Sequence, residues 1–532
     1  MPTLEDLSSA STMKKFPHVL DDPITLPRSL DPFTITTSTG FMPLVLPPVT
    51  LPEVFAPLTS ILDRTPVEKE DGTPGLLATF ELGPVVEKEL PDLTVEIDKL
   101  LTADGKPDLF TITAVFRDYS FLASSYLLEP CWEQWKTNPD SGYGLGRDRL
   151  PHSVAGPMYR CAELLDIPPF LSYAAAYSLF NYKLADPSKG HEYSNLRLVR
   201  AFERGLNPNS SEAGFILTHI HMVKETHALI SGVVRILNTL DTVKDRKEIN
   251  DAYRQILTAM DKIEECMEDM WKNSKPQEYL CFRVFIFGIT SQSMFPNGVV
   301  YEGIHDNKPL YFRGESGAND SIVSSPIEIR FAITLTIAQI PLLDHLLEIP
   351  MPDTPLTKIL HEFRAYRPLP HREFLAHVRI RSAEIGVQKY SVQDPETVFL
   401  YLKALDHVRS FRWRHWLFAR EYIIKRTPHP TATGGSPIVT WLPNQLAAVM
   451  DLMISTYDEY VTPVVKNGTA ANGGAPSESK TGATAEGLEL GSSQHYRKQV
   501  EEMMETVRDQ RVKLAKEVER WCAERGVPTQ PK

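Results

Sequence analysis

From about residue 155 to residue 465, seven segments carry apolar residues three and four positions apart, the repeat of a helix with one buried face. These segments are 168–184, 211–238, 246–272, 327–347, 355–364, 394–426 and 440–465. So many helical patterns in succession predict a mainly α-helical fold. The short apolar runs between residues 70 and 150 fit short strands and short helices equally well.

The two ends of the chain differ from this helical body. Residues 17–53 are rich in proline and lack a clear period, which predicts an irregular N-terminal arm. Residues 466–494 consist largely of Gly, Ala, Ser and Thr, and this composition predicts a flexible loop. The charged segment 495–525 has a sparse apolar stripe and predicts a helix docked on the main body.

These patterns divide the chain into five parts. We expect an arm over 1–54, a smaller N-terminal domain of α+β or irregular character over 55–200, a large all-helical domain over 201–465, a loop over 466–494 and a C-terminal helix within 495–532.

Composition excludes several classes of protein. The chain has 532 residues and a formal net charge of -12, whereas a nucleic-acid surface needs concentrated positive charge. Its five cysteines are scattered without a C-x-x-C pair, which disfavours a disulfide framework and a zinc knuckle. The N-terminus lacks the apolar core of a signal peptide, and the longest nearly uncharged run, 331–343, is too short to span a bilayer. We expect a cytoplasmic protein without nucleic-acid or membrane partners.

Generic catalytic motifs are poorly supported. The glycines of Gly142-Tyr-Gly144-Leu-Gly146 follow no apolar strand, as a dinucleotide fingerprint requires. The sequence Gly314-Glu-Ser316-Gly317 lacks the G-x-S-x-G spacing of a nucleophile elbow, and neither a Walker loop nor H-E-x-x-H occurs. Hydrolase and nucleotide-binding functions are therefore disfavoured.

A histidine on an apolar helix face is more informative. In segment 394–426, Asp394 is a suitable N-cap and Pro395 suits the first helical position. His415 shares a face of this predicted helix with Tyr401, Ala404, Val408, Phe411, Phe418, Ala419 and Tyr422. A haem axial ligand needs such a setting, but a hydrogen-bonded core histidine fits it too, and the helix alone favours the second interpretation.

Two further polar residues lie in apolar surroundings. The helical neighbours of His219 are all apolar, whereas those of His221 are more polar, so His219 is the better candidate to line a pocket or to be a buried structural histidine. Arg283 lies within YLCFRVFIFGI and must be paired if it is buried. Its partner is either an internal carboxylate, which the sequence alone favours, or the carboxylate of a substrate.

Taken in order along the chain, several segments resemble the indoleamine 2,3-dioxygenase family of haem enzymes. The resemblance covers about residues 55–465. The matching segments are Leu165-Asp-Ile-Pro-Pro-Phe-Leu-Ser-Tyr-Ala, Ala201-Phe-Glu-Arg204, Gly214-Phe215, Gly298-Val-Val-Tyr-Glu-Gly303, Phe312-Arg-Gly-Glu-Ser-Gly-Ala, Tyr366-Arg-Pro-Leu-Pro-His-Arg-Glu-Phe-Leu375, Phe411-Arg-Trp-Arg-His-Trp, Tyr422-Ile-Ile and Thr433-Gly434-Gly435.

The resemblance assigns roles to residues of this chain. It implies one haem b with His415 as the proximal iron ligand, and it places Arg412 and Ile423 beside the cofactor. It makes His219 and Ser316 catalytic, with His219 in the distal pocket on the side of the substrate. It also implies a set of substrate-binding residues, to which a distal helix of the smaller domain contributes: Tyr173, Ala176, Tyr177, Phe215, Arg283, Gly317, Thr433 and Gly434.

The implied reaction is activation of dioxygen on reduced haem and its insertion across the indole C2–C3 bond of L-tryptophan, which gives N-formylkynurenine and requires an electron donor. Several positions depart from the family pattern, among them the glycine-rich haem-edge loop, which here is Gly314-Glu-Ser-Gly-Ala-Asn-Asp-Ser with two added acidic residues. Alignment leaves either His219 or His221 at the distal position, and Glu278 replaces an aromatic residue where it could compete with a substrate carboxylate for Arg283. A diverged enzyme for a modified indole and a non-catalytic haem protein therefore remain alternatives.

Overall fold

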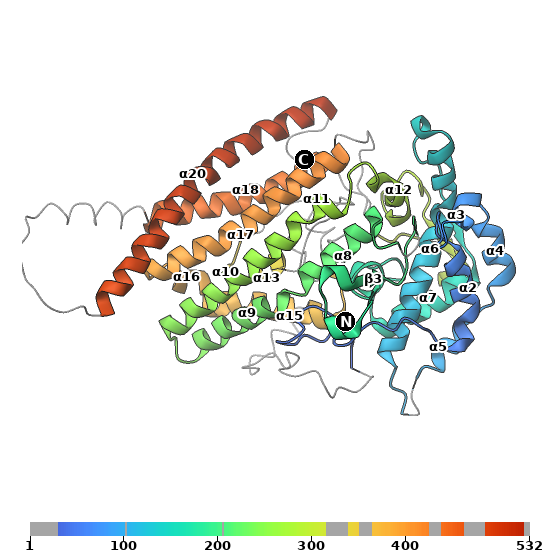
Figure 1. The fold of residues 1–532 in the computed structure, drawn as a ribbon, viewed down its shortest axis with the longest axis horizontal. Helices are drawn as coiled ribbons and strands as arrows, with labels where there is room; N and C mark the ends of the chain where they lie inside the picture. The colour runs from blue at the N-terminus through green and yellow to red at the C-terminus, as the bar shows by residue number, and fades with distance from the viewer. Residues whose placement is uncertain are drawn as a thin grey trace, which may run out of the picture.

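The computed structural model describes residues 30–101, 104–204, 207–314, 339–350, 364–424, 438–461 and 485–525. Long helices run side by side through one half of the molecule, and shorter helices gather in the other half (Figure 1). The predicted mainly α-helical fold is confirmed. The five cysteines all fall within the described residues, and each is a free thiol.

The N-terminal half is built around one buried helix, α6 (Leu109–Thr137). Its side chains are buried on every face from Phe110 to Glu129, which explains why the sequence there shows no helical period. Asp108 caps its N-terminus by accepting a hydrogen bond from the Thr111 amide at 3.2 Å. The surrounding helices are α2 (Ala56–Arg64), α3 (Leu76–Thr79), α4 (Leu82–Glu89), α5 (Thr94–Asp98) and α7 (His152–Leu165).

The larger half is a set of helices packed around α10 (Arg246–Glu268), against which α8 (Ser211–Val223), α9 (Thr226–Asp241) and α17 (Pro395–Ala419) all lie. The expected helix over 211–238 is thus broken into two, α8 and α9. The remaining helices are α11 (Met270–Asn273), α12 (Tyr279–Arg283), α13 (Gln339–Leu346), α15 (Leu369–Ile385), α16 (Val387–Ser391) and α18 (Ile438–Thr456). The predicted segments 327–338 and 355–363 lie outside the described residues.

Only short strands accompany these helices in the described residues. Strand β2 (Tyr182–Leu184) pairs antiparallel with β3 (Leu196–Leu198), and β4 (Val299–Tyr301) lies between β1 (Arg149–Leu150) and β5 (Pro309–Leu310). The predicted helix over 168–184 is therefore wrong. Only one π-helical turn, η3 (Tyr173–Tyr177), forms before the chain enters β2, whose backbone pairs with β3 rather than with a preceding helical turn.

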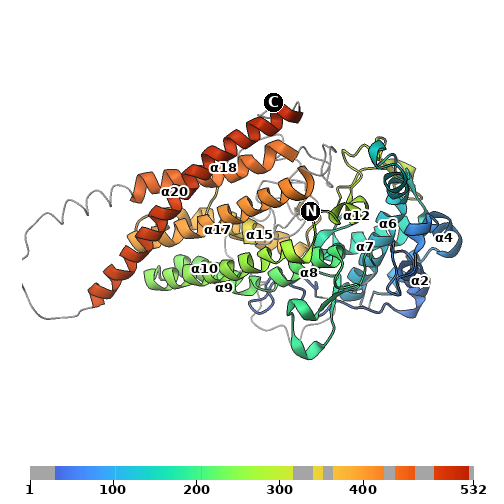
Figure 2. The same cartoon turned by 45° about the horizontal axis from the view of Figure 1, so that its top comes forward.

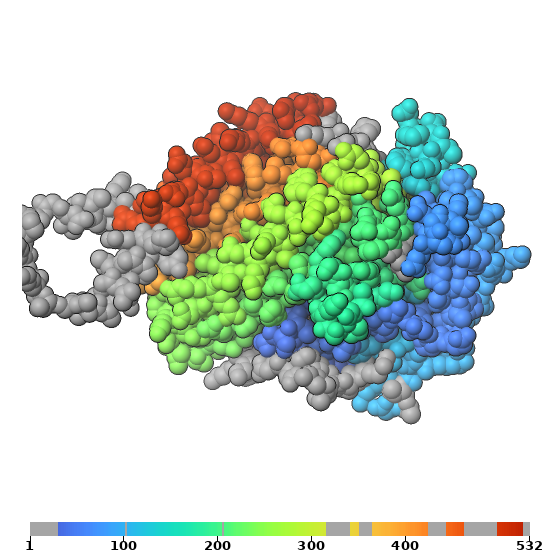
Figure 3. All heavy atoms as spheres, in the orientation of Figure 1, coloured from blue at the N-terminus to red at the C-terminus, as the bar shows by residue number. Residues whose placement is uncertain are grey.

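The C-terminal helix α20 (Ala485–Arg525) lies along α17 and α18 in two orientations of the molecule (Figures 1 and 2). It begins at Ala485 rather than at residue 495, so the end of the expected 466–494 loop is helical. Ala, Glu and Leu there are strong helix formers, which outweigh the small polar residues among them. The space-filling view shows α20 as an outer layer of the molecule (Figure 3). Within the described residues, every helix is too short or too polar to pass through a lipid bilayer.

Candidate functional site

The helix that carries His415 is defined at its start by the predicted cap. The Asp394 carboxylate accepts a hydrogen bond from the Thr397 amide at 2.9 Å, and Pro395 is the first helical residue. A π-helical turn, η9 (Arg420–Ile424), continues α17. His415 is 3% exposed. The apolar residues expected to share its face are all buried: Tyr401, Ala404, Val408, Phe411, Phe418, Ala419 and Tyr422.

The second histidine lies on α8, which starts at the Ser210 cap. His219 is fully buried, and its Nδ1 lies 2.8 Å from the Phe215 carbonyl oxygen. Because a carbonyl only accepts, Nδ1 is the donor of this contact. Gly214 allows α8 to approach α11 closely, since a Cβ at this position would lie 1.8 Å from the Asn273 carbonyl oxygen.

Aromatic residues surround His219. The Phe215 ring meets the imidazole edge-on at 4.7 Å, and the Tyr173 ring does so at 5.9 Å. His221 instead is partly exposed beside Tyr193, and burial together with Lys224 lowers its pKa. Of the two histidines, His219 is thus the one packed against the predicted substrate-binding residues.

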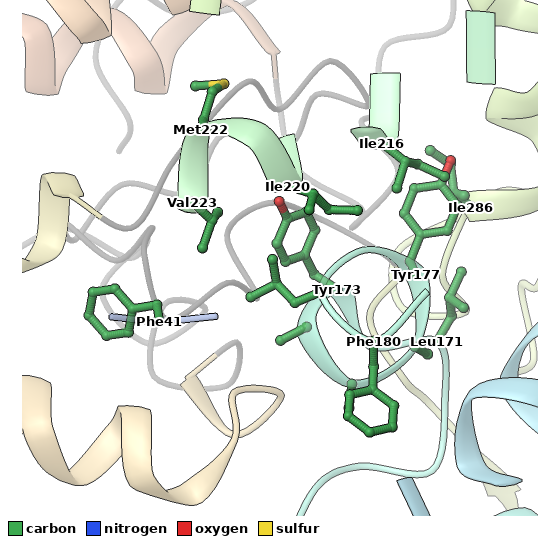
Figure 4. Packing of buried hydrophobic residues seen from close by; sticks show 14 of the residues in the cluster. Phe41, Leu171, Tyr173, Tyr177, Phe180, Ile216, Ile220, Met222, Val223 and Ile286 are labelled. Carbon is green, nitrogen blue, oxygen red and sulfur yellow. The ribbon is translucent and has the colours of Figure 1, made fainter. Parts of the chain in front are cut away.

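The turn η3 faces α8. Tyr173 lies beside Ile220, and Tyr177 lies beside Ile216 (Figure 4). Tyr173, Ala176 and Tyr177 are all buried. The structure brings Tyr173 to His219, whereas the Tyr177 ring stacks on Phe121 and Phe202 at 6.0 and 6.1 Å. The substrate-binding roles of these residues stay predictions.

Tyr279 joins this cluster to the helix of His415. Its ring lies 6.0 Å from Phe215 on α8 and 6.1 Å from Tyr422, which follows α17. The Tyr422 hydroxyl donates to the Ser274 carbonyl oxygen at 2.5 Å and so fixes its own ring. Sequence reasoning did not select Tyr279, although it directly follows the position where Glu278 replaces an aromatic residue.

Arg283 is fully buried at the end of α12. Its Nη1 donates to the Tyr143 hydroxyl at 3.3 Å, and its guanidinium lies 4.6 Å from the centre of the Phe287 ring. The guanidinium is therefore held by neutral groups on at least two sides.

Glu278 does not compete for Arg283 as expected. Its carboxylate accepts a hydrogen bond from the Ser211 hydroxyl at 2.6 Å and pairs with Lys275 Nζ at 3.1 Å. The Ser211 hydroxyl is the main cause that lowers the pKa of Glu278, which therefore stays ionised. Glu278 and Arg283 are five positions apart, and residues at this spacing do not share a helix face. Their side chains therefore point in different directions.

Arg412 is engaged in a buried ion pair. Its Nη2 donates to both carboxylate oxygens of Asp344 at 2.9 and 2.8 Å, and its Nη1 donates to the Gln445 carbonyl oxygen at 3.2 Å. Burial lowers the pKa of Arg412, and Asp344 opposes that shift. Arg412 thereby ties α17 to α13 and α18, three residues before His415.

Asp344 was missed in the sequence. A carboxylate inside the apolar run IPLLDHLL is the signal that could have revealed it, because a buried charge needs a partner.

Other predicted residues have different outcomes. Ile423 is fully buried within η9. Ser316, Gly317, Thr433 and Gly434 lie outside the described residues, so their roles stay predictions.

The profile of the indoleamine 2,3-dioxygenase family matches residues 29–451, which include α8, α12 and α17. The chain belongs to the indoleamine 2,3-dioxygenase family. It is similar to indoleamine 2,3-dioxygenase 1 of Mus musculus, with 26% identity over 401 residues that cover 75% of this chain and 85% of the mouse protein.

Fungal members of the family are similar as well. Indoleamine 2,3-dioxygenase of Saccharomyces cerevisiae is 24% identical over 294 residues, which are 53% of this chain and 60% of the yeast protein. Indoleamine 2,3-dioxygenase nanC of Aspergillus nanangensis is 23% identical over 315 residues, 57% of this chain and 68% of that protein.

The residues on α17 fit the haem expected of an indoleamine 2,3-dioxygenase. A porphyrin supplies four nitrogen ligands, so the iron needs an axial side chain rather than a chelating cluster. His415 offers an imidazole on a dry helix face, and the described residues contain no group of three His, Cys, Asp or Glu side chains that could hold a metal ion. A buried imidazole of this kind suits the axial position that a haem iron needs.

Proposed function

We propose that this member of the family is a haem-dependent dioxygenase that inserts dioxygen across the indole C2–C3 bond of L-tryptophan and produces N-formylkynurenine. Family membership supports the reaction class. The observation that carries the assignment is the continuous aromatic contact from His219 through Phe215 and Tyr279 to Tyr422, which lies seven residues after His415. This contact joins the surroundings of His219 to the end of the helix that carries His415.

His415 is the residue that would hold the haem iron, and bound haem would supply the redox chemistry that activates dioxygen. The ion pair between Arg412 and Asp344 would hold the helix of His415 in place. Ile423 and the buried aromatic residues beside it would exclude water from this side of the site.

His219 would recognise the indole ring. Its Nδ1 donates to the Phe215 carbonyl oxygen, so in the neutral tautomer Nε2 would be the ring nitrogen that accepts a hydrogen bond from the indole N–H. Tyr173 and Phe215 hold the imidazole edge-on and would offer apolar walls to the indole. Ser316 would act with His219 in the catalytic pocket, on the basis of the resemblance alone.

Arg283 would bind the carboxylate of the amino acid. A planar guanidinium can donate two parallel hydrogen bonds to a carboxylate, and burial strengthens this attraction. Because Glu278 pairs with Lys275, a substrate carboxylate would not have to displace it. This contact favours L-tryptophan over an indole that lacks the carboxylate. Gly317, Thr433 and Gly434 are proposed to complete the substrate site.

An optical titration of the haem-loaded, reduced protein with L-tryptophan tests the proposal, first without and then with oxygen. We expect a Soret band that is lost in His415→Ala, followed by the absorbance of N-formylkynurenine. A Soret band without product from any indole would instead indicate a non-catalytic haem protein. A Soret band that His415→Ala retains would refute the ligand assignment.

The substrate is tested by Arg283→Ala with L-tryptophan and with tryptamine, which lacks the carboxylate. We expect the KM for L-tryptophan to rise by about tenfold or more, as for loss of a charged hydrogen bond, while the KM for tryptamine stays close to that of the parent. An unchanged KM for L-tryptophan, with tryptamine the better substrate of the parent, would favour a modified indole.

A further inference from the structure

The C-terminal helix α20 lies outside the residues that match the family, which end at 451. It nevertheless packs on α17, the helix of His415, and on α18 (Figures 1 and 2). The residues of α20 that are buried in this contact are Val500, Met504, Val507, Leu514 and Cys522. The helix is therefore docked by its own apolar stripe, as the sequence predicted.

Polar side chains fix the register of α20 against α17 along most of its length. Lys403 Nζ donates to Gln499 Oε1 at 2.5 Å, and Arg409 Nη1 donates to Gln510 Oε1 at 2.5 Å. Further along, the exposed pair of Arg511 and Asp451 links α20 to α18. These contacts lead toward the end of α17 where His415 lies.

Among these contacts between α20 and α17, Glu517 reaches the residue that directly follows His415. Its Oε2 accepts a hydrogen bond from Trp416 Nε1 at 2.7 Å, and its Oε1 accepts one from Arg420 Nη1 at 3.3 Å. Trp416 and Arg420 are four residues apart and so lie on one face of the helix. Both carboxylate oxygens of Glu517 are thus used to hold this face.

Neighbouring residues of an α-helix point about 100° apart. Fixing the Trp416 indole toward α20 therefore also fixes the direction in which His415 points. Trp416 is fully buried, so its indole N–H needs an acceptor, and Glu517 supplies a charged one.

We propose that Glu517 is a positioning residue for His415, and that α20, which lies beyond the family match, braces the proximal side of the haem site. Glu517 acts through Trp416 and does not touch the cofactor. The inference rests on the proposed function only in that His415 holds haem.

Haem transfer from the full-length protein to excess apomyoglobin tests this inference. Glu517→Ala removes the acceptor of the Trp416 N–H. We expect haem loss to accelerate by about threefold or more, because part of the free energy of a hydrogen bond to a charged group is then lost. Glu517→Gln keeps an acceptor oxygen and should restore most of the parent rate. Glu519→Ala, an exposed acid two residues further on, is the matched control and should lose haem at the parent rate.

A spectroscopic readout separates positioning from general stability. The iron–histidine stretching band of the reduced protein should shift in Glu517→Ala and stay in place in Glu519→Ala. Trp416→Phe removes the indole N–H together with part of the buried ring, so it should accelerate haem loss at least as much as Glu517→Ala does, and adding Glu517→Ala to it should give little further increase.

Two results would overturn the inference. One is equal haem loss and an unshifted band in Glu517→Ala and Glu519→Ala; the other is haem loss from Glu517→Gln as fast as from Glu517→Ala. If the parent retains haem and His415→Ala does not, such results would refute the brace alone. Failure of the parent itself to bind haem would refute the proposed function.

Discussion

The buried pair of Arg412 and Asp344 offers a quantitative test of how the helix of His415 is held. The side chains are 4% and 3% exposed, and two hydrogen bonds of 2.9 and 2.8 Å join them. Removing one partner of such a pair leaves an uncompensated charge in the interior and costs about 3–5 kcal/mol. Asp344→Asn keeps one acceptor oxygen, so we expect the lower end, about 3 kcal/mol, or roughly a hundredfold in the unfolding equilibrium.

A second ion pair on the neighbouring helix provides the control. Arg511 on α20 donates to Asp451 on α18 at 2.8 Å, but these side chains are 33% and 56% exposed. Because water screens them, Asp451→Asn should lower the free energy of unfolding by less than about 1 kcal/mol. Urea unfolding of the apoproteins, followed by circular dichroism, measures both variants in the same way.

The double replacement of Arg412 and Asp344 by Met and Leu sharpens the test. It removes both charges and should recover most of the stability lost in Asp344→Asn, because apolar residues of similar volume avoid the desolvation cost. Equal losses in Asp344→Asn and Asp451→Asn would refute the reasoning that burial determines the cost.

Three more predictions concern the distal side. Gly214→Ala should lower the free energy of unfolding by about 1–3 kcal/mol in urea, since its Cβ would overlap the Asn273 carbonyl oxygen, and an unchanged midpoint would contradict this contact. Burial raises the pKa of Glu212 to about 8, so its stabilising contribution is complete below the unfolded pKa of 4.5 and is lost as the pH rises to about 8. Glu212→Gln should reduce the pH slope of the urea data by up to about 1.4 kcal/mol per pH unit, and an unchanged slope would assign it elsewhere. Glu278→Gln should leave the KM for L-tryptophan within about twofold of the parent, as Glu278 pairs with Lys275 rather than Arg283, and a tenfold change would contradict that separation.

Local sequence signals predicted α17 well. A cap at Asp394, a proline at the next position and a continuous apolar face are all short-range features, and the structure retains each of them. The same reasoning failed over 168–184, where the apolar residues have a helical spacing. The end of this segment, Tyr182–Leu184, forms a strand because its backbone pairs with Leu196–Leu198. That partner lies too far along the chain to be reported by a local pattern of apolar residues.

The candidate site shows the same division. The sequence and its family resemblance selected His219, Phe215 and Tyr173, and in the structure the rings of Phe215 and Tyr173 both meet the His219 imidazole edge-on, while their roles in substrate binding stay predictions. The sequence did not reveal Tyr279 as the link between α8 and the end of α17. The sequence also suggested that Glu278 competes with a substrate carboxylate for Arg283. The structure differs, because spacing along the chain does not report the direction of a side chain at a helix start.

The sequence by itself determined the helical character of this protein, its family and the selection of His219 and His415 as histidines in apolar surroundings, since periodicity and ordered motifs are properties of the chain. Only the tertiary structure decided which charges are paired. Asp344 comes to Arg412 from a distant segment, and Glu517 reaches Trp416 from a helix beyond the family match. These partners were not predictable, because a buried charge or N–H requires a partner but does not specify where in the sequence that partner lies.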